Sequence, residues 1–479
     1  MRSRPGPEVE WKTAMKQSAA PTVESRLAAH LAAADHGSLP EAALSRAGRS
    51  ILWWIATALE GSMAPEQAAL QRYFGNQGGP AESSVLGARM RAPAEVAGLI
   101  NGRAGKVNER EEKYWVSESI GFSIGVCVVP AAAAVAQAVG HVSGRDLLAA
   151  VAVATDLEAR LLRPVGMGFI PGRKAANTSF ALGNYGAAVV AGKLLGLSRD
   201  QFLDALGLAH AQSCGTYQGQ YDGRGVPVQC GFAVRNGITA ARLAGAGVTG
   251  PIASLTGRAG LYAQHFPHSS VEPDLILDEL GREYLGAKIG FKAYPCGIVA
   301  HPAVDAVREI RPEIRDREID TIAVSGSGSL LIMAEPAEQK RSPETATEAR
   351  FSLPWAVACA LRDGDLTLKH FETESLGDPG LQAIAAKVRV TMDDEAEGTT
   401  VALTFTDGSQ LSSAPVIIAR GHPDRPLATS EIEDLFRASA ARALVPATHA
   451  ERALKMLVNL ESVSDVGEIV TLLESDGPR

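Results

Sequence analysis

The stretch EAALSRAGRSILWWIATALE, residues 41–60, sets the fold class of this 479-residue chain. Its apolar residues recur at three- and four-residue spacing, which predicts a helix. The Trp53-Trp54 pair lies in an apolar part of this helix and is expected in an aromatic core or a subunit contact. The same helical spacing, with Gly or Pro at the breaks, recurs over residues 24–36, 93–102, 144–163 and 184–196.

Alanine and glycine are abundant on these helical faces. Small residues let helices approach closely, so the first part of the chain is predicted to form a compact helical bundle. The pattern changes near residue 286. Short strands are then predicted at 319–324, 387–392 and 400–405, with a hairpin turn at Asp407-Gly408.

Helical patterns return at 302–310, 352–362 and 430–444. The predicted fold is therefore mainly α with an α+β second domain. We expect a flexible lead-in over 1–22, a helical domain from 23–285 and 425–479, and a smaller α+β domain over 286–424.

Composition excludes several classes of function. The net charge is −8 and basic residues are interspersed with acidic ones, so nucleic acid is not an expected partner. The five cysteines are odd in number and form no CxxC pair, which indicates neither a disulfide framework nor a metal site and fits the cytoplasm. No signal peptide and no membrane-spanning stretch is recognised.

The segment KAYPCGIVAH, residues 292–301, gathers the groups most suited to chemistry. His301 is the first candidate for proton abstraction or donation, because imidazole titrates near working pH. Lys292 could bind a carboxylate, and a buried phenol such as that of Tyr294, beside a lysine, can serve as a general acid.

Together with RNGITAARLAGAGVTGP (235–251) and EARFSLPWAVACALRDG (348–364), this segment resembles the MmgE/PrpD family, which includes 2-methylcitrate dehydratase, cis-aconitate decarboxylase and iminodisuccinate epimerase. The resemblance implies a large all-helical domain built from both chain ends and a smaller α+β lid over the site. It also implies a homodimer formed through the helical domain and an enzyme that needs no cofactor.

Several positions depart from the family pattern. Where the family shows an Asp-x-Asp-Asp-Thr run, this chain has Glu109 to Lys113, and Ser119 or Ser123 stands nearest to a family histidine. A second family histidine is matched by Asn177, and a family lysine by Val226. Trp355 replaces a lid-domain tyrosine of some decarboxylases.

Other charged residues could contact the substrate. Arg173, Lys174 and Arg224 could bind a carboxylate or another anionic group. Glu109, Glu111 and Glu112 could orient the site, or act as a base if burial raises a carboxyl pKa. The alternative for this acidic run is a helix end that faces solvent.

We therefore expect an enzyme that performs proton-transfer chemistry next to a carbonyl or carboxylate, either a lyase or an isomerase. Its small-molecule substrate is expected to differ from 2-methylcitrate, and specialised metabolism is one setting for it. The alternative is a non-catalytic binding or assembly protein that retained the fold.

Overall fold

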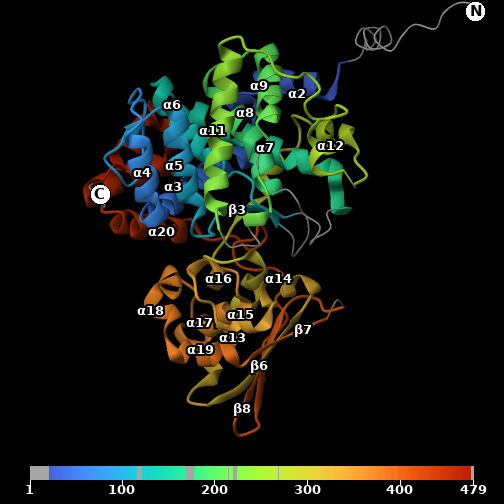
Figure 1. Ribbon diagram of the computed structural model, residues 1–479, viewed down its shortest axis with the longest axis vertical. Helices are drawn as coiled ribbons and strands as arrows, with labels where there is room; N and C mark the ends of the chain where they lie inside the picture. The colour runs from blue at the N-terminus through green and yellow to red at the C-terminus, as the bar shows by residue number, and fades with distance from the viewer. Residues whose placement is uncertain are drawn as a thin grey trace, which may run out of the picture.

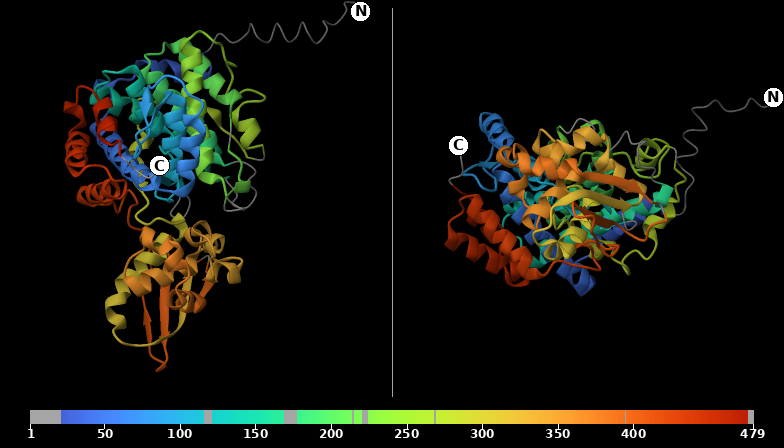
Figure 2. Two further views of the ribbon diagram at one scale, coloured as in Figure 1. Left: turned by 60° about the vertical axis from the view of Figure 1, so that its left-hand side comes forward. Right: turned by 90° about the horizontal axis from the view of Figure 1, so that it is seen from below.

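The computed structural model describes residues 21–115, 121–168, 177–213, 215–219, 224–267, 269–393 and 395–475. Figure 1 shows a large helical body above a smaller body coloured yellow to orange, and the left view in Figure 2 shows the same division. The predicted fold class, mainly α with a smaller α+β part, is confirmed. Residues 1–20, most of the expected lead-in, lie outside the described residues.

The large body contains helices from both ends of the described chain (Figure 1). Its longer helices are α2 (Val23–Ala33), α3 (Glu41–Ser62), α4 (Pro65–Gly75), α5 (Ala94–Lys106), α6 (Val128–Val139), α7 (Gly144–Leu162), α8 (Thr178–Leu194), α9 (Arg199–Ala211), α11 (Val226–Gly245), α20 (Thr429–Arg442) and α21 (Ala447–Val458). The C-terminal α20 packs against α3, which links the two ends of the chain. Among the described residues, no helix has the length and apolar character that a membrane crossing requires.

Small residues set the distances between these helices, as predicted. A Cβ on Gly237 of α11 would lie 2.5 Å from the Cβ of Ala187 on α8. A Cβ on Gly231 would lie 2.4 Å from the backbone oxygen of Leu99 on α5. Neither contact is sterically possible, so α11 packs against both neighbours only because these positions lack side chains.

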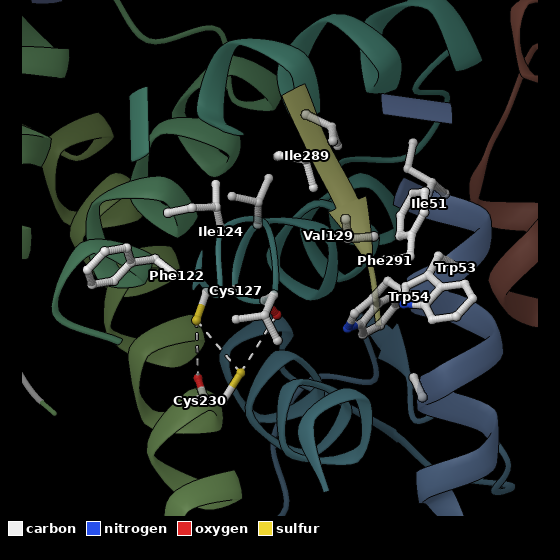
Figure 3. Packing of buried hydrophobic residues seen from close by; sticks show 14 of the residues in the cluster. Ile51, Trp53, Trp54, Phe122, Ile124, Cys127, Val129, Cys230, Ile289 and Phe291 are labelled. Atoms are coloured by element: carbon white, nitrogen blue, oxygen red, sulfur yellow. Dashed lines mark hydrogen bonds between the residues drawn. The ribbon is translucent and has the colours of Figure 1, made fainter. Parts of the chain in front are cut away.

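Aromatic side chains also pack against one another in the core of the large body (Figure 3). Trp53 and Trp54 are both buried, which confirms the prediction of an aromatic core. The Trp53 ring lies 5.1 Å from the ring of Phe291, and its Nε1 donates to the Arg110 carbonyl at 2.6 Å. The buried thiols of Cys127 and Cys230 lie 3.7 Å apart and form no disulfide.

Two small sheets interrupt the helical body, and the sequence patterns did not predict them. Strand β1 (Ser83–Ser84) pairs with β2 (Arg91–Ala92), and the second sheet has the order β4-β3-β5. The strands of the second sheet are β3 (Glu112–Trp115), β4 (Gly121–Phe122) and β5 (Ile289–Phe291). Strand β5 belongs to a segment that we expected at the start of the smaller domain, but it is hydrogen-bonded to β3 of the large body.

The smaller body is built on a four-stranded sheet of order β7-β6-β8-β9. Its strands are β6 (Ile319–Gly326), β7 (Val388–Met392), β8 (Thr400–Phe405) and β9 (Gln410–Ser412). The three predicted strands and the hairpin are confirmed: Gly408 takes a φ of 80°, and the Phe405 N–H donates to the Ser409 carbonyl at 2.9 Å. Strand β8 buries alternate residues against α13 (His301–Ile314) and its neighbours, as one-sided sheets do.

Two backbone segments cross between the bodies side by side. The Phe291 N–H donates to the Gly421 carbonyl at 2.8 Å, and Gly421 has a φ of 93°. A side chain at Gly421 would collide with the Phe291 carbonyl at 2.0 Å. Glycine is therefore required where the chain returns to the large body.

Candidate active site

A cavity of about 510 Å³ lies where the two bodies meet, within the size range of small-molecule sites. From the large body it is lined by Lys106, Glu109, Glu111, Lys113, Gly121, Phe122, Ser123, Asn177, Thr178, Ser179, Phe180, Tyr217, Val226 and Lys292. From the smaller body it is lined by Gly297, Ile298, Val299, Ser327, Gly328, Ser329, Ile332, Met333 and Phe351. Any molecule held there would contact both bodies.

The chain between α5 and β3 supplies most of the charged groups. Helix α5 ends at Lys106, and Glu109 turns the chain with a φ of 53°, a conformation that is uncommon outside glycine. Because strand side chains alternate, Glu111 and Lys113 then face the cavity and Glu112 faces the opposite side.

Strand pairing adds a charge from a distant part of the chain. Glu112 lies opposite Phe291 in the β3–β5 ladder. Continuing this register by one residue sets Lys292 opposite Glu111, as a cross-strand pair of opposite charge. Lys106, Glu109, Glu111, Lys113 and Lys292 together form what we call the lysine–glutamate cluster.

The cluster is tightly interlinked and almost fully buried. Lys292 Nζ lies 2.8 Å from Glu109 Oε2 and 2.9 Å from Glu111 Oε1. Lys106 Nζ contacts Glu109 Oε1 and lies 3.3 Å from Glu111 Oε2. Lys113 Nζ lies 3.3 Å from Glu111 Oε1. Three ammonium groups against two carboxylates leave one positive charge when all five groups are ionised.

In four of these groups, burial and the neighbouring opposite charges shift the pKa in opposing directions. Burial raises the pKa of Glu111, but Lys106, Lys292 and Lys113 outweigh it and hold the pKa well below its ordinary value. The pKa of Glu109 is likewise lowered by its lysines against burial and the charge of Glu111. Burial lowers the pKa of Lys292, but Glu109 and Glu111 outweigh it and raise the pKa above its ordinary value. These three side chains are therefore charged at neutral pH.

Lys113 is different. Burial, the largest cause, lowers its pKa to about 8, because Glu111 opposes the shift only in part and Lys292 and Lys106 add to it. Its Nζ donates to Ser123 Oγ at 2.9 Å, and Ser123 Oγ donates in turn to Glu111 Oε1 at 3.1 Å. Lys113 can therefore both hold and release a proton near neutral pH while staying fixed in position.

Of the residues predicted from sequence, the cavity brings together Lys292, Glu109, Glu111 and Asn177, which stands at the N-cap position of α8. Val226, matched to a family lysine, lines the cavity at the start of α11. Ser123, near the expected histidine position, also lines it. The roles assigned to these residues stay predictions.

His301 does not line the cavity, and this corrects its first place among the predicted proton-transfer groups. It begins α13 inside the smaller body, fully buried, with its ring 5.1 Å from the ring of Tyr294. Among the described residues, neither ring nitrogen has a hydrogen-bond partner of ordinary geometry. The nearby Cys296 backbone acts to raise the pKa of His301. Burial and the charge of Lys292 lower the pKa of His301 to about 3, so the imidazole is neutral.

Three other predicted residues also turn away from the cavity. The Tyr294 hydroxyl donates to Asp305 Oδ1. Trp355 is buried in α17 (Leu353–Asp363), and its Nε1 donates to the His370 carbonyl at 3.0 Å. Glu112 accepts a hydrogen bond from Ser50 on the far side of β3. Each of these side chains contacts other parts of the protein, whereas a catalytic or substrate-binding role was expected.

Of the three remaining predicted cations, the structure describes Arg224. Arg224 is exposed and does not line the cavity. Arg173 and Lys174 lie outside the described residues, as does Ser119. The interpretation of Glu109 to Glu112 as a solvent-facing helix end is wrong, because all four residues are buried.

Sequence reasoning did not select Lys106 or Lys113. The sequence signal that could have identified Lys113 is the alternation Glu111-Glu112-Lys113, because in a strand it places Glu111 and Lys113, of opposite charge, on the same side. The strand was too short and too charged to be recognised. In the part of the chain that the structure describes, no group of three or more histidine, cysteine, aspartate or glutamate side chains could hold a metal ion.

Comparisons with known proteins agree with this architecture. The MmgE/PrpD N-terminal domain matches residues 25–274, and the MmgE/PrpD C-terminal domain matches residues 294–462. The chain is 26% identical over 462 residues to the cis-aconitate decarboxylase-like protein oryM of Aspergillus oryzae, covering 91% of this chain and 94% of the relative. It is 25% identical over 460 residues to human cis-aconitate decarboxylase, covering 92% of each. It is also 25% identical over 471 residues to cis-aconitate decarboxylase of Aspergillus terreus, covering 91% of this chain and 92% of the relative. Because the N-terminal domain alone spans more than half of the sequence, the chain belongs to the MmgE/PrpD family.

Proposed function

We propose that this protein is a lyase of the dehydratase or decarboxylase type, which transfers a proton at a carbon next to a substrate carboxylate through Lys113. The relatives named above include cis-aconitate decarboxylases that align along more than nine-tenths of their length, which supports the general class. The particular reaction and substrate are part of the proposal.

The observation that carries the proposal is the place of Lys113 within the cavity. It lines the cavity beside Glu111, its side chain is only 11% exposed, and Ser123 fixes its ammonium group. General acid–base catalysis requires a group that is held in position and titrates near working pH. Lys113 meets both requirements, with a pKa lowered by burial to about 8.

The other charged groups have fixed roles in the proposal. Lys106 and Lys292 offer positive charge to a substrate carboxylate, while Glu109 and Glu111 hold both lysines in place. The reacting carbon then lies within reach of Lys113. Proton transfer of this kind draws on side chains alone and needs no cofactor.

Both lyase reactions can use the same lysine. In a decarboxylation, the bond to the departing carbon dioxide breaks, its electron pair stays on the substrate carbon, and the Lys113 ammonium protonates that carbon. In a dehydration, the Lys113 amine takes the proton from carbon and returns it to the departing hydroxyl, so that water leaves and a double bond forms.

We further propose that 2-methylcitrate is not the substrate. Asn177 and Val226 line the cavity at positions where the resemblance implies a histidine and a lysine, and His301 lies away from it. Acid–base groups each contribute about 10²–10⁴-fold in rate, so the dehydration of 2-methylcitrate would be slow with this set of residues.

The test is turnover of the purified protein, followed by proton NMR in deuterated water. The substrates are 2-methylcitrate, citrate, cis-aconitate, iminodisuccinate, alkyl-substituted analogues of these acids, and 3-hydroxy monocarboxylic acids with an alkyl chain. For a substrate that turns over, Lys113→Met should lower the rate by about 10²–10⁴-fold. The control is Lys288→Met, because Lys288 is a 61% exposed lysine that pairs with Glu283 at the surface.

The outcomes separate the alternatives. Loss of carbon dioxide or water that depends on Lys113 supports the proposal, whereas deuterium incorporation without loss of either would indicate an isomerase. Unchanged turnover by the Lys113→Met variant would contradict the role of this lysine. No turnover of any acid would favour a non-catalytic binding protein.

A further inference from the structure

The cavity has two chemically different ends. The lysine–glutamate cluster occupies one wall, on the large body. The wall from the smaller body is mainly apolar, with Ile298, Val299, Ile332, Met333 and Phe351. Phe122, Phe180 and Val226 add apolar surface from the large body. A small polyacid would leave most of this apolar surface uncovered.

Ile332 stands out on the apolar wall. It lies in the short helix α14 (Leu331–Ala334) and is 54% exposed, whereas the next residue, Met333, is 1% exposed. An isoleucine that lines a cavity and stays exposed has surface available for a ligand. Covering apolar surface with an apolar group is favourable by about 25 cal/mol per Å².

The charge of the cluster limits how many carboxylates it can accept. Among the described lining residues, all cations belong to the cluster, and each is already paired with a glutamate. One added carboxylate neutralises the single net positive charge. A tricarboxylate would bring two negative charges that the described lining residues do not compensate, which is costly in a largely buried site.

A second, smaller cavity lies behind the apolar wall. Ile298, Val299, Ser327 and Ser329 separate the main cavity from this smaller cavity of about 100 Å³ and line both. Trp115, Val416 and Ile417 line the far side of the smaller cavity. The main cavity, at about 510 Å³, itself has room for a group longer than a methyl or ethyl branch.

We infer that the substrate is an organic acid with one carboxylate at the lysine–glutamate cluster and an extended apolar remainder along Ile298, Val299, Ile332, Met333 and Phe351. This inference rests on the proposed function, since it names the substrate class of the same site. It gives the apolar wall the role of selecting the substrate.

The test uses simple acids as probes, so it does not require knowledge of the true substrate. Isothermal titration calorimetry would compare butanoate, hexanoate and octanoate with propane-1,2,3-tricarboxylate. Affinity should rise by about two- to fourfold for each added methylene, as expected for apolar burial. Octanamide, which lacks the charge, should bind at least about tenfold more weakly than octanoate because the cluster holds the carboxylate.

A matched pair of variants locates the apolar contact. Ile332→Ser should weaken octanoate binding by about tenfold and leave butanoate binding unchanged. Ile252→Ser is the control, because Ile252 is 59% exposed and does not line the cavity. It should change neither affinity.

Two results would overturn the inference. One is tighter binding of the tricarboxylate than of octanoate, and the other is an affinity that does not depend on chain length or on Ile332. Neither would bear on proton transfer, which the Lys113→Met turnover experiment tests separately. Conversely, octanoate binding that depends on Ile332, with turnover that does not depend on Lys113, would leave the substrate class standing and reject the proposed function.

Discussion

The two sides of strand β3 hold buried carboxyl groups in opposite states. On the cavity side, Glu109 and Glu111 are paired with lysines that lower the pKa of each, so both are ionised. Behind the strand, burial raises the pKa of Glu112 to about 7 and that of Glu158, on α7, to about 8. The same residue type at similar depth is thus charged or neutral according to its partners, and burial alone decides neither case.

The hydrogen bonds on the rear side agree with this difference. Glu158 Oε2 accepts from the Gly125 N–H at 2.7 Å, and Glu112 accepts from the Ser50 hydroxyl. The other oxygen of each carboxyl group has no hydrogen-bond partner among the residues that the structure describes. No described lysine or arginine forms an ion pair with either residue, and the nearby charge of Arg46 lowers the pKa of Glu112 only in part. The cavity side is thus built for charge, and the rear side for neutral acids.

Of the substitutions that test this difference between the two sides, Glu111→Gln should lower the free energy of unfolding most. It would leave three buried ammonium groups with one carboxylate, and breaking a buried ion network by removing one partner costs about 3–5 kcal/mol. Urea denaturation at pH 7 would measure the loss in the free energy of unfolding. Glu112→Gln is the matched control from the neighbouring position and should not lower stability at pH 7, because the unfolded chain releases the Glu112 proton near the ordinary pKa of 4.5 whereas the folded protein keeps it until about pH 7. Equal losses in the two variants would remove the contrast between the two sides.

Glu158→Gln should have a smaller effect that depends on pH. The unfolded chain releases this proton near the ordinary pKa of 4.5, whereas the folded protein keeps it until about pH 8. The contribution to stability is therefore present below pH 4.5 and is lost as pH rises towards 8. The variant, which stays neutral, should be more stable than the natural protein by about 1–3 kcal/mol at pH 9 and similar to it at pH 5.

Chemical denaturation at the two pH values would measure this difference. Glu112, the charged side chain that acts on Glu158, is unchanged in the variant, as are Arg46 and Ser50, which act on Glu112. A variant that is less stable than the natural protein at pH 9 would show that Glu158 is ionised and stabilising there.

Sequence patterns predicted the fold better than the site. The helices and the strands at 319–324, 387–392 and 400–405 follow local periodicity, so they could be identified without tertiary information. The lysine–glutamate cluster depends on the pairing of β3 with β5, which brings Lys292 to Glu111 across a separation that local patterns do not encode. Long-range register is therefore the information that the sequence analysis lacked.

The segment KAYPCGIVAH shows the same limit over ten residues. Lys292 and Gly297 line the cavity, whereas Tyr294 points to Asp305 and His301 is enclosed within the smaller body. Residues that are close in sequence face different sides, because the chain leaves a strand and enters a helix of the other body within this segment. Residue type alone suggested His301 for proton transfer, because imidazole titrates near working pH, but its burial and lowered pKa depend on tertiary packing that the sequence patterns did not predict.

The central claim is that Lys113 exchanges a proton near neutral pH while Lys292, in the same cluster, stays charged. The most direct measurement is an NMR titration of the protein labelled with carbon-13 at the lysine ε-carbons, with the Lys113 signal assigned from its loss in Lys113→Met. We expect this signal to titrate near pH 8, well before those of surface lysines. A Lys113 signal that titrates together with the surface lysines would contradict the claim.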